Sequence, residues 1–178
     1  VARPEERHFL GFRLRRKPED GSVEVLLSKR SKARIDAKVR ELTPRNWGRA
    51  LQACIDGINV YLRGWIGFFG ICTEGEGRTL RNLDAHIRRR LRAIQLKQWK
   101  CKRTIARRLI KMGIRAHTAW KRIYEGRKSI WALSHTPTVD RALSNGHWTA
   151  LGLESLAALW SKLAHRRVAP KQLTLALG

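Results

Sequence analysis

Hydrophobic residues recur along this chain at two different spacings, and the first of them is typical of strands. Residues 8–14 (HFLGFRL) and 23–27 (VEVLL) are two short β-prone runs. Pro18, Asp20 and Gly21 lie between them, and these residue types favour turns. The pattern therefore predicts a β-hairpin at the N-terminus.

After residue 28 the spacing changes to the helical period. Ile35, Val39 and Leu42 fall at positions i, i+4 and i+7 of one expected helix. Ser31 is the expected cap of this helix and Pro44 its stop, because serine side chains cap helix starts and proline cannot continue a helix.

A second helix is expected over residues 47–69, where apolar residues recur every three or four positions. Trp65 lies on its apolar face, three residues after Leu62 and seven after Ile58. We therefore expect Trp65 to be part of the core.

The third expected helix, residues 79–100, combines two stripes. Its apolar stripe consists of Leu80, Leu83, Ile87, Leu91 and Ile94. At about 100° per residue, a second stripe lies roughly a third of a turn away. The second stripe consists of Arg81, Arg88, Arg92 and Trp99. The pattern predicts that the second stripe faces solvent while Leu83, Ile87, Leu91 and Ile94 are buried.

Shorter helices are expected in the remainder of the chain. A fourth helix begins near residue 104 and ends at Gly113, a residue type that favours the left-handed position after a helix. Residues 116–124 form the fifth helix, and further helices are expected over 138–143 and 153–163. Asn145 and Gly146 are expected to separate the last two, and residues 166–178 form a loosely held tail.

The net charge and composition of the chain indicate the class of partner that it binds. The chain of 178 residues has 38 Lys and Arg against 14 Asp and Glu, a formal net charge of +24. Its hydrophobic content of 43 % and its seven Trp predict a folded protein rather than a basic disordered tail. A polyanion is the natural partner of such a charge.

Residues 86–111 concentrate this charge, because they hold eleven Lys or Arg and no acid. A solvated helix face usually alternates in sign, since like charges four residues apart repel each other. Nucleic-acid binding is therefore favoured over a merely solvated face. For Trp99, stacking on a base and packing under the next helix both remain open.

The remaining chemistry is sparse. Cys54, Cys72 and Cys101 have neither disulfide nor zinc spacing, so we expect free thiols in a reducing compartment. The acids are scattered, the six His lie at least 12 residues apart, and no pattern of catalytic residues emerges.

No segment approaches the roughly 18 apolar residues of a membrane span. The chain begins at Val1 without a signal peptide, so a piece of a longer protein is expected.

Four segments, taken together and in order, resemble group II intron reverse transcriptases. Residues 9–12 (FLGF) resemble the last block of the polymerase palm, near the primer grip. Residues 58–70 and 83–100 are similar to the maturase-specific domain, also called domain X or the thumb. Residues 130–156 resemble the C-terminal signature, in which a Trp is followed by Ser-x-x-Pro, Ala-Leu-x-Asn and Gly-Leu-x-Ser-Leu. The resemblance spans roughly residues 6–160.

The resemblance implies a module that grips intron RNA and the template–primer duplex, while the RNA supplies the splicing chemistry. The catalytic Tyr-x-Asp-Asp motif of the family occurs nowhere in this sequence. This fragment of a reverse transcriptase family is therefore not expected to polymerise alone, and Mg²⁺ is expected only together with the missing palm. Intron RNA and the duplex are the expected partners, with DNA as a further one and no membrane. We expect the protein to be located in the bacterial cytoplasm as part of a ribonucleoprotein, with an organelle as the alternative location.

The predicted fold is mainly α, with an N-terminal β-hairpin, a thumb-like helical bundle and a smaller C-terminal helical appendix. The expected units are residues 1–28 (end of the palm), 29–115 (maturase-specific bundle), 116–165 (appendix) and 166–178 (tail). The expected RNA-binding residues are Arg81, Arg88, Arg89, Arg92, Lys97, Trp99, Lys100, Lys102, Arg103, Arg107 and Arg108. The primer-grip-like residues are Phe9, Leu10, Gly11 and Phe12.

Two other readings stay open at this point. One is the C-terminal part of a complete reverse transcriptase whose palm lies upstream of Val1. The other is a structural RNA-binding protein of ribosomal type, unrelated to introns.

Overall fold

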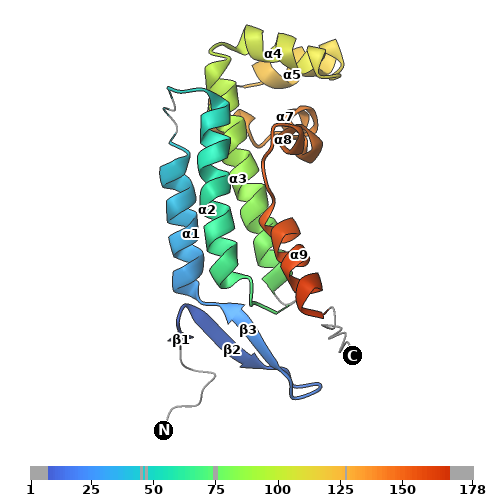
Figure 1. Ribbon diagram of the computed structural model, residues 1–178. Helices are drawn as coiled ribbons and strands as arrows, with labels where there is room; N and C mark the ends of the chain where they lie inside the picture. Colours follow the sequence, from blue (N-terminus) through green and yellow to red (C-terminus); the bar gives the residue numbers. More distant parts are fainter. Residues whose placement is uncertain (1–7, 45, 47, 74–75, 127, 169–178) are drawn as a thin grey trace, which may run out of the picture.

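Three long helices stand side by side on a small sheet (Figure 1). The computed structural model describes residues 8–44, 46, 48–73, 76–126 and 128–168, with side chains of residues 8, 9 and 165–168 left aside. The described residues are mainly helical and begin with an antiparallel hairpin, so the predicted fold class is confirmed. Among them, no helix combines the length and apolar character needed to cross a lipid bilayer.

The sheet consists of β1 (His8–Phe9), β2 (Phe12–Arg16) and β3 (Val23–Leu27), all antiparallel neighbours. The predicted first strand over residues 8–14 is therefore split into β1 and β2. A two-residue turn separates them, with φ of 49° at Leu10 and 87° at Gly11. Positive φ at both central positions is the pattern of a tight hairpin turn that matches the strand twist.

Helix α1 (Lys29–Leu42) follows the sheet directly. Its cap is Ser28, whose side chain accepts a hydrogen bond from the backbone N–H of Ser31 at 3.1 Å. The prediction of Ser31 as the cap was wrong, because Ser31 already lies inside the first turn. Its hydroxyl instead donates to the carbonyl of Gly11 at 2.7 Å and so connects α1 to the β1–β2 turn.

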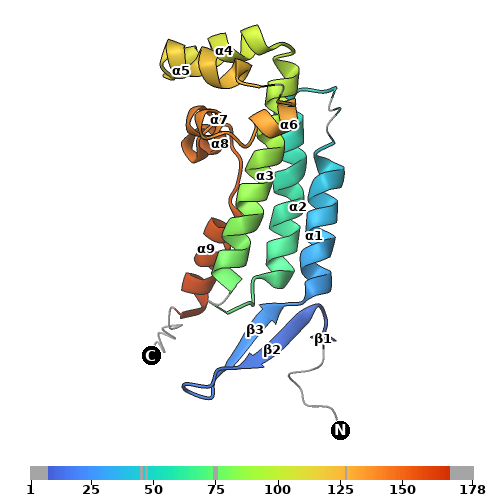
Figure 2. The same cartoon turned by 180° about the vertical axis from the view of Figure 1, so that it is seen from behind.

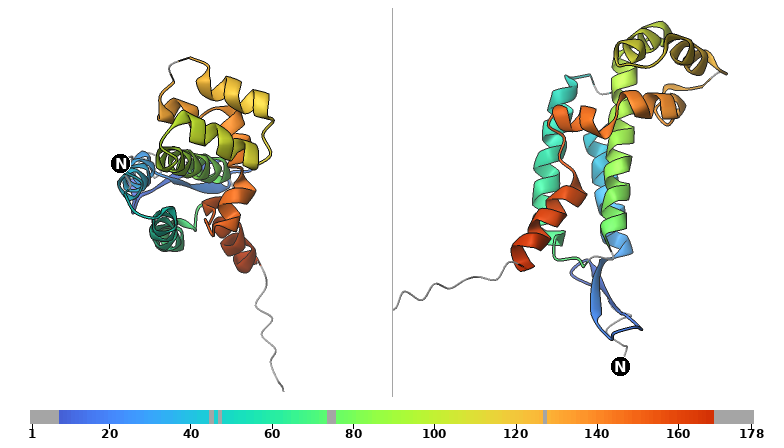
Figure 3. Two further views of the ribbon diagram at one scale, coloured as in Figure 1. Left: turned by 90° about the horizontal axis from the view of Figure 1, so that it is seen from above. Right: turned by 90° about the vertical axis from the view of Figure 1, so that its right-hand side faces the viewer.

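Helices α2 (Leu51–Phe69) and α3 (Gly77–Gln98) complete the bundle. The first helix turn predicted from residue 47 is absent over 48–50, and residue 47 lies outside the described residues. Trp65 is buried in the core, as predicted. Ile87, Leu91 and Ile94 are also buried as predicted, whereas Leu83 is only partly buried. Figure 3 shows α1, α2 and α3 from above and from the side.

Helices α4 (Lys102–Lys111) and α5 (Ala116–Tyr124) pack against each other across the end of the bundle that lies farthest from the sheet (Figure 1). Gly113 follows α4 with a φ of 89°, which confirms the predicted left-handed position. Helix α5 coincides with the predicted range 116–124. Both helices bury a narrow apolar face, leaving their outer faces exposed.

The appendix contains α6 (Ile130–Leu133), α7 (Pro137–Ala142), α8 (Asn145–Ala150) and α9 (Leu156–Val168). Asn145 and Gly146, expected to break the helical structure, are instead the first residues of α8. Helix α9 begins three residues later than predicted and includes the first three residues of the predicted tail. Residues 169–178 lie outside the described residues.

Several polar side chains of the bundle bond to the signature segment and to the start of α9, among them Asn59 and Asp84. Asn59 of α2 donates to the carbonyl of Gly152 at 2.7 Å and accepts from the N–H of Glu154 at 3.0 Å. Asp84 of α3 accepts from the N–H groups of Leu156 and Ala157 at 2.8 and 3.2 Å. These bonds fix the appendix along α2 and α3, as seen from behind in Figure 2.

Candidate nucleic-acid interface

The arginine stripe predicted on α3 is divided by the fold between surface and interior. Arg81 is exposed and Arg88 is half-buried, whereas Arg92 is only 7 % exposed. Arg92 forms an ion pair with Asp140 of α7, so its predicted exposure was wrong. The physical reason is that the appendix covers this part of α3, which the periodicity of a single helix does not show.

Burial also changes the proton affinity of Arg92. Desolvation, with smaller contributions from the nearby charges of Arg88 and Arg89, lowers the pKa of Arg92 to about 10. Arg88, Arg89 and Arg92 share this part of α3 with a single carboxylate, that of Asp140, so it has an excess of positive charge at neutral pH.

Trp99 was predicted to lie on the exposed stripe, and this prediction was also wrong. Its side chain is only 5 % exposed and belongs to the core. The guanidinium of Arg108 on α4 lies 5.6 Å from the centroid of the Trp99 ring. Trp99 thus packs under α4, which is the second of the two roles considered for it, and it is not available for stacking on a base.

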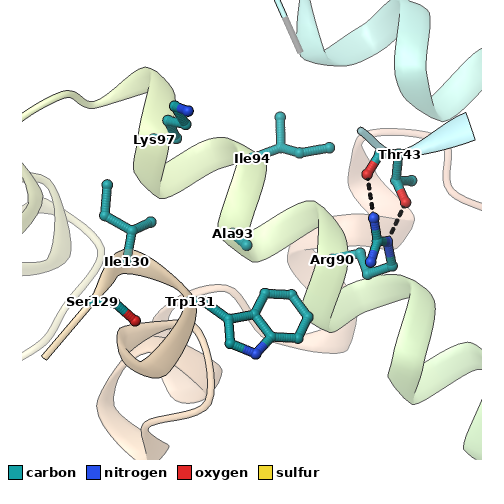
Figure 4. A pocket seen from close by; sticks show the side chains of 8 residues that line it. All are labelled: Thr43, Arg90, Ala93, Ile94, Lys97, Ser129, Ile130 and Trp131. Atoms are coloured by element: carbon teal, nitrogen blue, oxygen red, sulfur yellow. Dashed lines mark hydrogen bonds between the residues drawn. The ribbon is translucent and has the colours of Figure 1, made fainter. Parts of the chain in front are cut away.

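Arg90, from the same basic run, serves the fold. Its guanidinium donates to the carbonyl of Thr43 at 2.6 Å and to the Thr43 hydroxyl (Figure 4). It also donates to the carbonyl of Arg40 at 3.3 Å. It thereby satisfies carbonyl groups at the end of α1 that lack partners within the helix. Beside it lies a cavity of about 320 Å³, which Ile94 and Trp131 help to line.

Basic side chains that remain exposed gather where α3 ends and α4 begins. Lys97 and Lys100 are exposed, and Lys97 donates to the side chain of Asn46. Lys102 is half-buried, with its ammonium 3.4 Å from the carbonyl oxygen of Gly126. Arg89 is exposed on the side of α3 that faces the appendix.

Helix α4 carries the most regular basic row. Arg103, Arg107 and Lys111 follow one another at a spacing of four, so they share one face, and all three are exposed. Arg108 is exposed beside them. None of these four residues forms an ion pair with any other residue that the structure describes. We call Arg103, Arg107, Arg108 and Lys111 the α4 basic row.

An aromatic pair on α5, the helix that packs against α4, was not singled out from the sequence. Trp120 and Tyr124 of α5 have ring centroids 5.7 Å apart and are 36 % and 51 % exposed. The ammonium of Lys102 lies 5.8 Å from the Tyr124 ring centroid, which connects the pair to the start of α4. Their spacing of four residues, which places both rings on one side of α5, was the signal available in the sequence.

The primer-grip-like segment lies at the other end of the molecule, in the sheet. Phe12 is buried against the rings of Phe68 and Phe69, at centroid distances of 5.7 and 5.3 Å. Leu10 is 65 % exposed at the tip of the turn. Gly11 has no room for a side chain, because a Cβ there would lie 2.6 Å from the Ser31 hydroxyl. The side chain of Phe9 lies outside the described residues, and a primer grip here stays a prediction.

Thiol and metal chemistry adds little to this interface. Cys54 and Cys72 are buried and Cys101 is exposed, and none of the three forms a disulfide with a described residue. Within the described ranges, His, Cys, Asp and Glu side chains do not gather into a group that could hold a metal ion.

Comparison with known families identifies the central part of the chain. Residues 32–113 match the family model described as the group II intron, maturase-specific domain. This range begins in α1, includes α2 to α4 and ends at Gly113. A comparison with curated proteins found no match to the chain. Residues 32–113, somewhat less than half of the chain, are thus similar to the maturase-specific domain of group II introns.

Proposed function

We propose that this protein is a group II intron maturase and assists splicing by binding group II intron RNA through the α4 basic row and the adjoining end of α3. The observation that carries the proposal is the α4 basic row itself: exposed cations on a short helix, without ion pairs to the rest of the described protein. Like charges at a spacing of four residues repel one another in the absence of an anion. The RNA backbone supplies the missing negative charge as a row of phosphates.

The charge distribution around α4 supports this assignment. Between Asp84 and Glu125 the chain contains no acidic residue. The positive potential of α4 is therefore not cancelled by carboxylates on its own segment, and it extends to Lys97 and Lys100 at the end of α3. Such a continuous basic surface steers and holds a polyanion.

The aromatic pair on α5 gives the same surface a way to hold unpaired nucleotides. Bases stack on aromatic rings regardless of their identity, and each such contact contributes about 1 to 3 kcal/mol to binding. Trp120 and Tyr124 present exposed rings beside the basic residues of α4. The proposed interface thus combines phosphate contacts by α4 with stacking by α5.

The finer parts of the proposal concern reverse transcription. The bundle acts as the thumb of a reverse transcriptase and holds the template–primer duplex, and the palm with its metal-binding carboxylates precedes the sheet. The exposed turn at Leu10 and Gly11 contacts the primer end.

In splicing, the intron RNA performs the chemistry, while the protein supplies positive charge and positions the RNA fold.

The direct test replaces Arg103 and Arg107 together by Gln. If both residues contact phosphates, the slope of log affinity against log salt for an intron RNA flattens by roughly 1.4 to 1.8, since each contact contributes about 0.7 to 0.9. Affinity should be measured by fluorescence anisotropy at four or more salt concentrations. Circular dichroism confirms that the variant is folded.

A matched control is available on α1. Arg30 and Arg34 are also exposed and four residues apart, but they lie near the sheet, at the opposite end of the bundle from α4 (Figure 1). Replacing Arg30 and Arg34 by Gln removes the same charge and should change the slope by less than half as much. Equal slopes for the two double variants would show that only net charge matters, and would contradict the assignment to α4.

A further inference from the structure

The arginines of α3 that face the appendix line a cavity that the family match does not explain. This cavity has a volume of about 360 Å³ and lies between α3 and the segments around α6, α7 and α8. We call it the arginine pocket. Its lining residues are Ala85, Arg88, Arg89, Arg92, His135, Asp140 and Asn145.

The charges in the arginine pocket are unbalanced. Three guanidinium groups, those of Arg88, Arg89 and Arg92, share it with one carboxylate, that of Asp140. Asp140 pairs with Arg92 while remaining 63 % exposed itself. The carboxylate therefore offsets one of the three positive charges, and the other two remain without a counterion among the described residues.

Arg92 also retains an unused hydrogen-bond donor. Its side chain is more than nine-tenths buried, and its Nε–H has no acceptor among the described residues. A buried donor without a partner loses the hydrogen bond that it would make in water. A tetrahedral anion offers several oxygen atoms to arginine donors from different directions.

From this geometry we propose that the arginine pocket binds one backbone phosphate of the intron RNA. The proposal rests on the proposed RNA-binding function and adds a second contact point, beside α3 rather than on α4. A phosphodiester group accepts from the arginines, and Asn145 at the rim offers an amide that can hydrogen-bond to the sugar–phosphate backbone. The pocket also gives the signature segment 130–156 a role, because that segment supplies His135, Asp140 and Asn145.

Two substitutions with opposite expected effects test the pocket in the full chain. Arg89→Gln removes an exposed lining arginine and should weaken intron RNA binding roughly fivefold to tenfold, with a slope change of about 0.7 to 0.9. Asp140→Asn frees both the charge and the donors of Arg92 and should tighten RNA binding several-fold. The matched controls are Arg34→Gln and Glu41→Gln, which change the same charges on α1. Glu41 is 66 % exposed in an ion pair with Lys38 and so resembles Asp140.

A direct readout is the ¹⁵N NMR signal of the arginine Nε–H groups during titration with RNA and, separately, with inorganic phosphate. The proposal expects the Arg92 signal to shift on addition of RNA, and the midpoint of that shift to move to a roughly fivefold to tenfold higher RNA concentration in Arg89→Gln. A shift with inorganic phosphate but none with RNA would overturn the backbone-phosphate assignment in favour of a free anion.

The two proposals can fail separately. If RNA binds and depends on Arg103 and Arg107, but Arg89→Gln and Asp140→Asn match their α1 controls, the pocket is not a phosphate site while the α4 interface stands. If no variant alters RNA binding and the parent protein binds RNA without salt dependence, the proposed function itself is wrong.

Discussion

The guanidinium of Arg108 on α4 lies 5.6 Å from the ring centroid of Trp99, the C-cap residue directly after α3. This contact fixes α4 across the end of the bundle, because the Trp99 ring is buried beneath it. The orientation of the proposed RNA-binding helix therefore depends on an aromatic residue that does not itself reach the RNA.

Trp99→Ala should accordingly act first on stability. Removing a buried Trp leaves a cavity, and the expected loss in the free energy of unfolding is about 3 to 5 kcal/mol. Chemical denaturation followed by circular dichroism measures this loss, and Trp99→Phe should lose less. An unchanged unfolding free energy together with weakened RNA binding would mean that Trp99 contacts a base after all.

Asp84→Ala should loosen the appendix from the bundle. Its carboxylate accepts hydrogen bonds from the first N–H groups of α9 and, at 2.6 Å, from the Ser155 hydroxyl, so it caps α9 from a distance of some seventy positions in the sequence. The expected loss in unfolding free energy is about 2 kcal/mol. Hydrogen exchange should accelerate at the amides of Leu156 and Ala157.

Asp56 provides the control for Asp84. It is exposed on α2 and bonds only to a Gln52 amide in the described structure, so Asp56→Ala should cost less than about 0.5 kcal/mol. Equal losses for Asp84→Ala and Asp56→Ala would show that Asp84 does not cap α9.

Cys101 should be the most reactive thiol of the native protein. Hydrogen bonding by Thr104 lowers the pKa of Cys101, whereas burial raises the pKa of Cys54 to about 11. The thiolate is the reactive form, so at neutral pH Cys101 is more often ionised than an ordinary cysteine, and Cys54 much less. Alkylation with iodoacetamide near pH 7.5, followed by peptide mass spectrometry, should find Cys101 modified first.

The same reaction probes the interface, because Cys101 directly precedes α4. Bound intron RNA should slow the modification of Cys101. Rapid modification of Cys54 in the folded protein, or of Cys101 at the same rate with saturating RNA, would contradict this account.

The sequence predicted local structure well and burial against distant segments poorly. Helix α5 and the Gly113 position depend on neighbouring residues, and both were confirmed. The exposure of Arg92 depends on Asp140, which is 48 residues further along the chain, and was predicted wrongly. The helical period separates the faces of α3, but it does not show which element packs on each face.

Asn145 illustrates a second reason why prediction from the sequence was wrong in places: one residue type can either interrupt a helix or begin one. Asn and Gly commonly interrupt helices, yet Asn145 and Gly146 begin α8, since the first positions of a helix tolerate residues that are unfavourable in its interior. Of the predicted site, the exposed residues of α4 remain candidates for RNA contact. Trp120 and Tyr124 were missed because a pair of aromatic residues on a short helix is also compatible with burial in a core.

The central claim is that the α4 basic row serves a group II intron maturase rather than a general RNA-binding protein. The most direct measurement is a competition in which the purified protein, at near-physiological salt, is offered labelled group II intron RNA against unlabelled ribosomal RNA of the same length. The account predicts that the intron RNA is retained at a large excess of competitor, and that Arg103→Gln with Arg107→Gln weakens this retention. Equal competition by ribosomal RNA, or a preference for it, would contradict the account and favour a structural RNA-binding protein of ribosomal type.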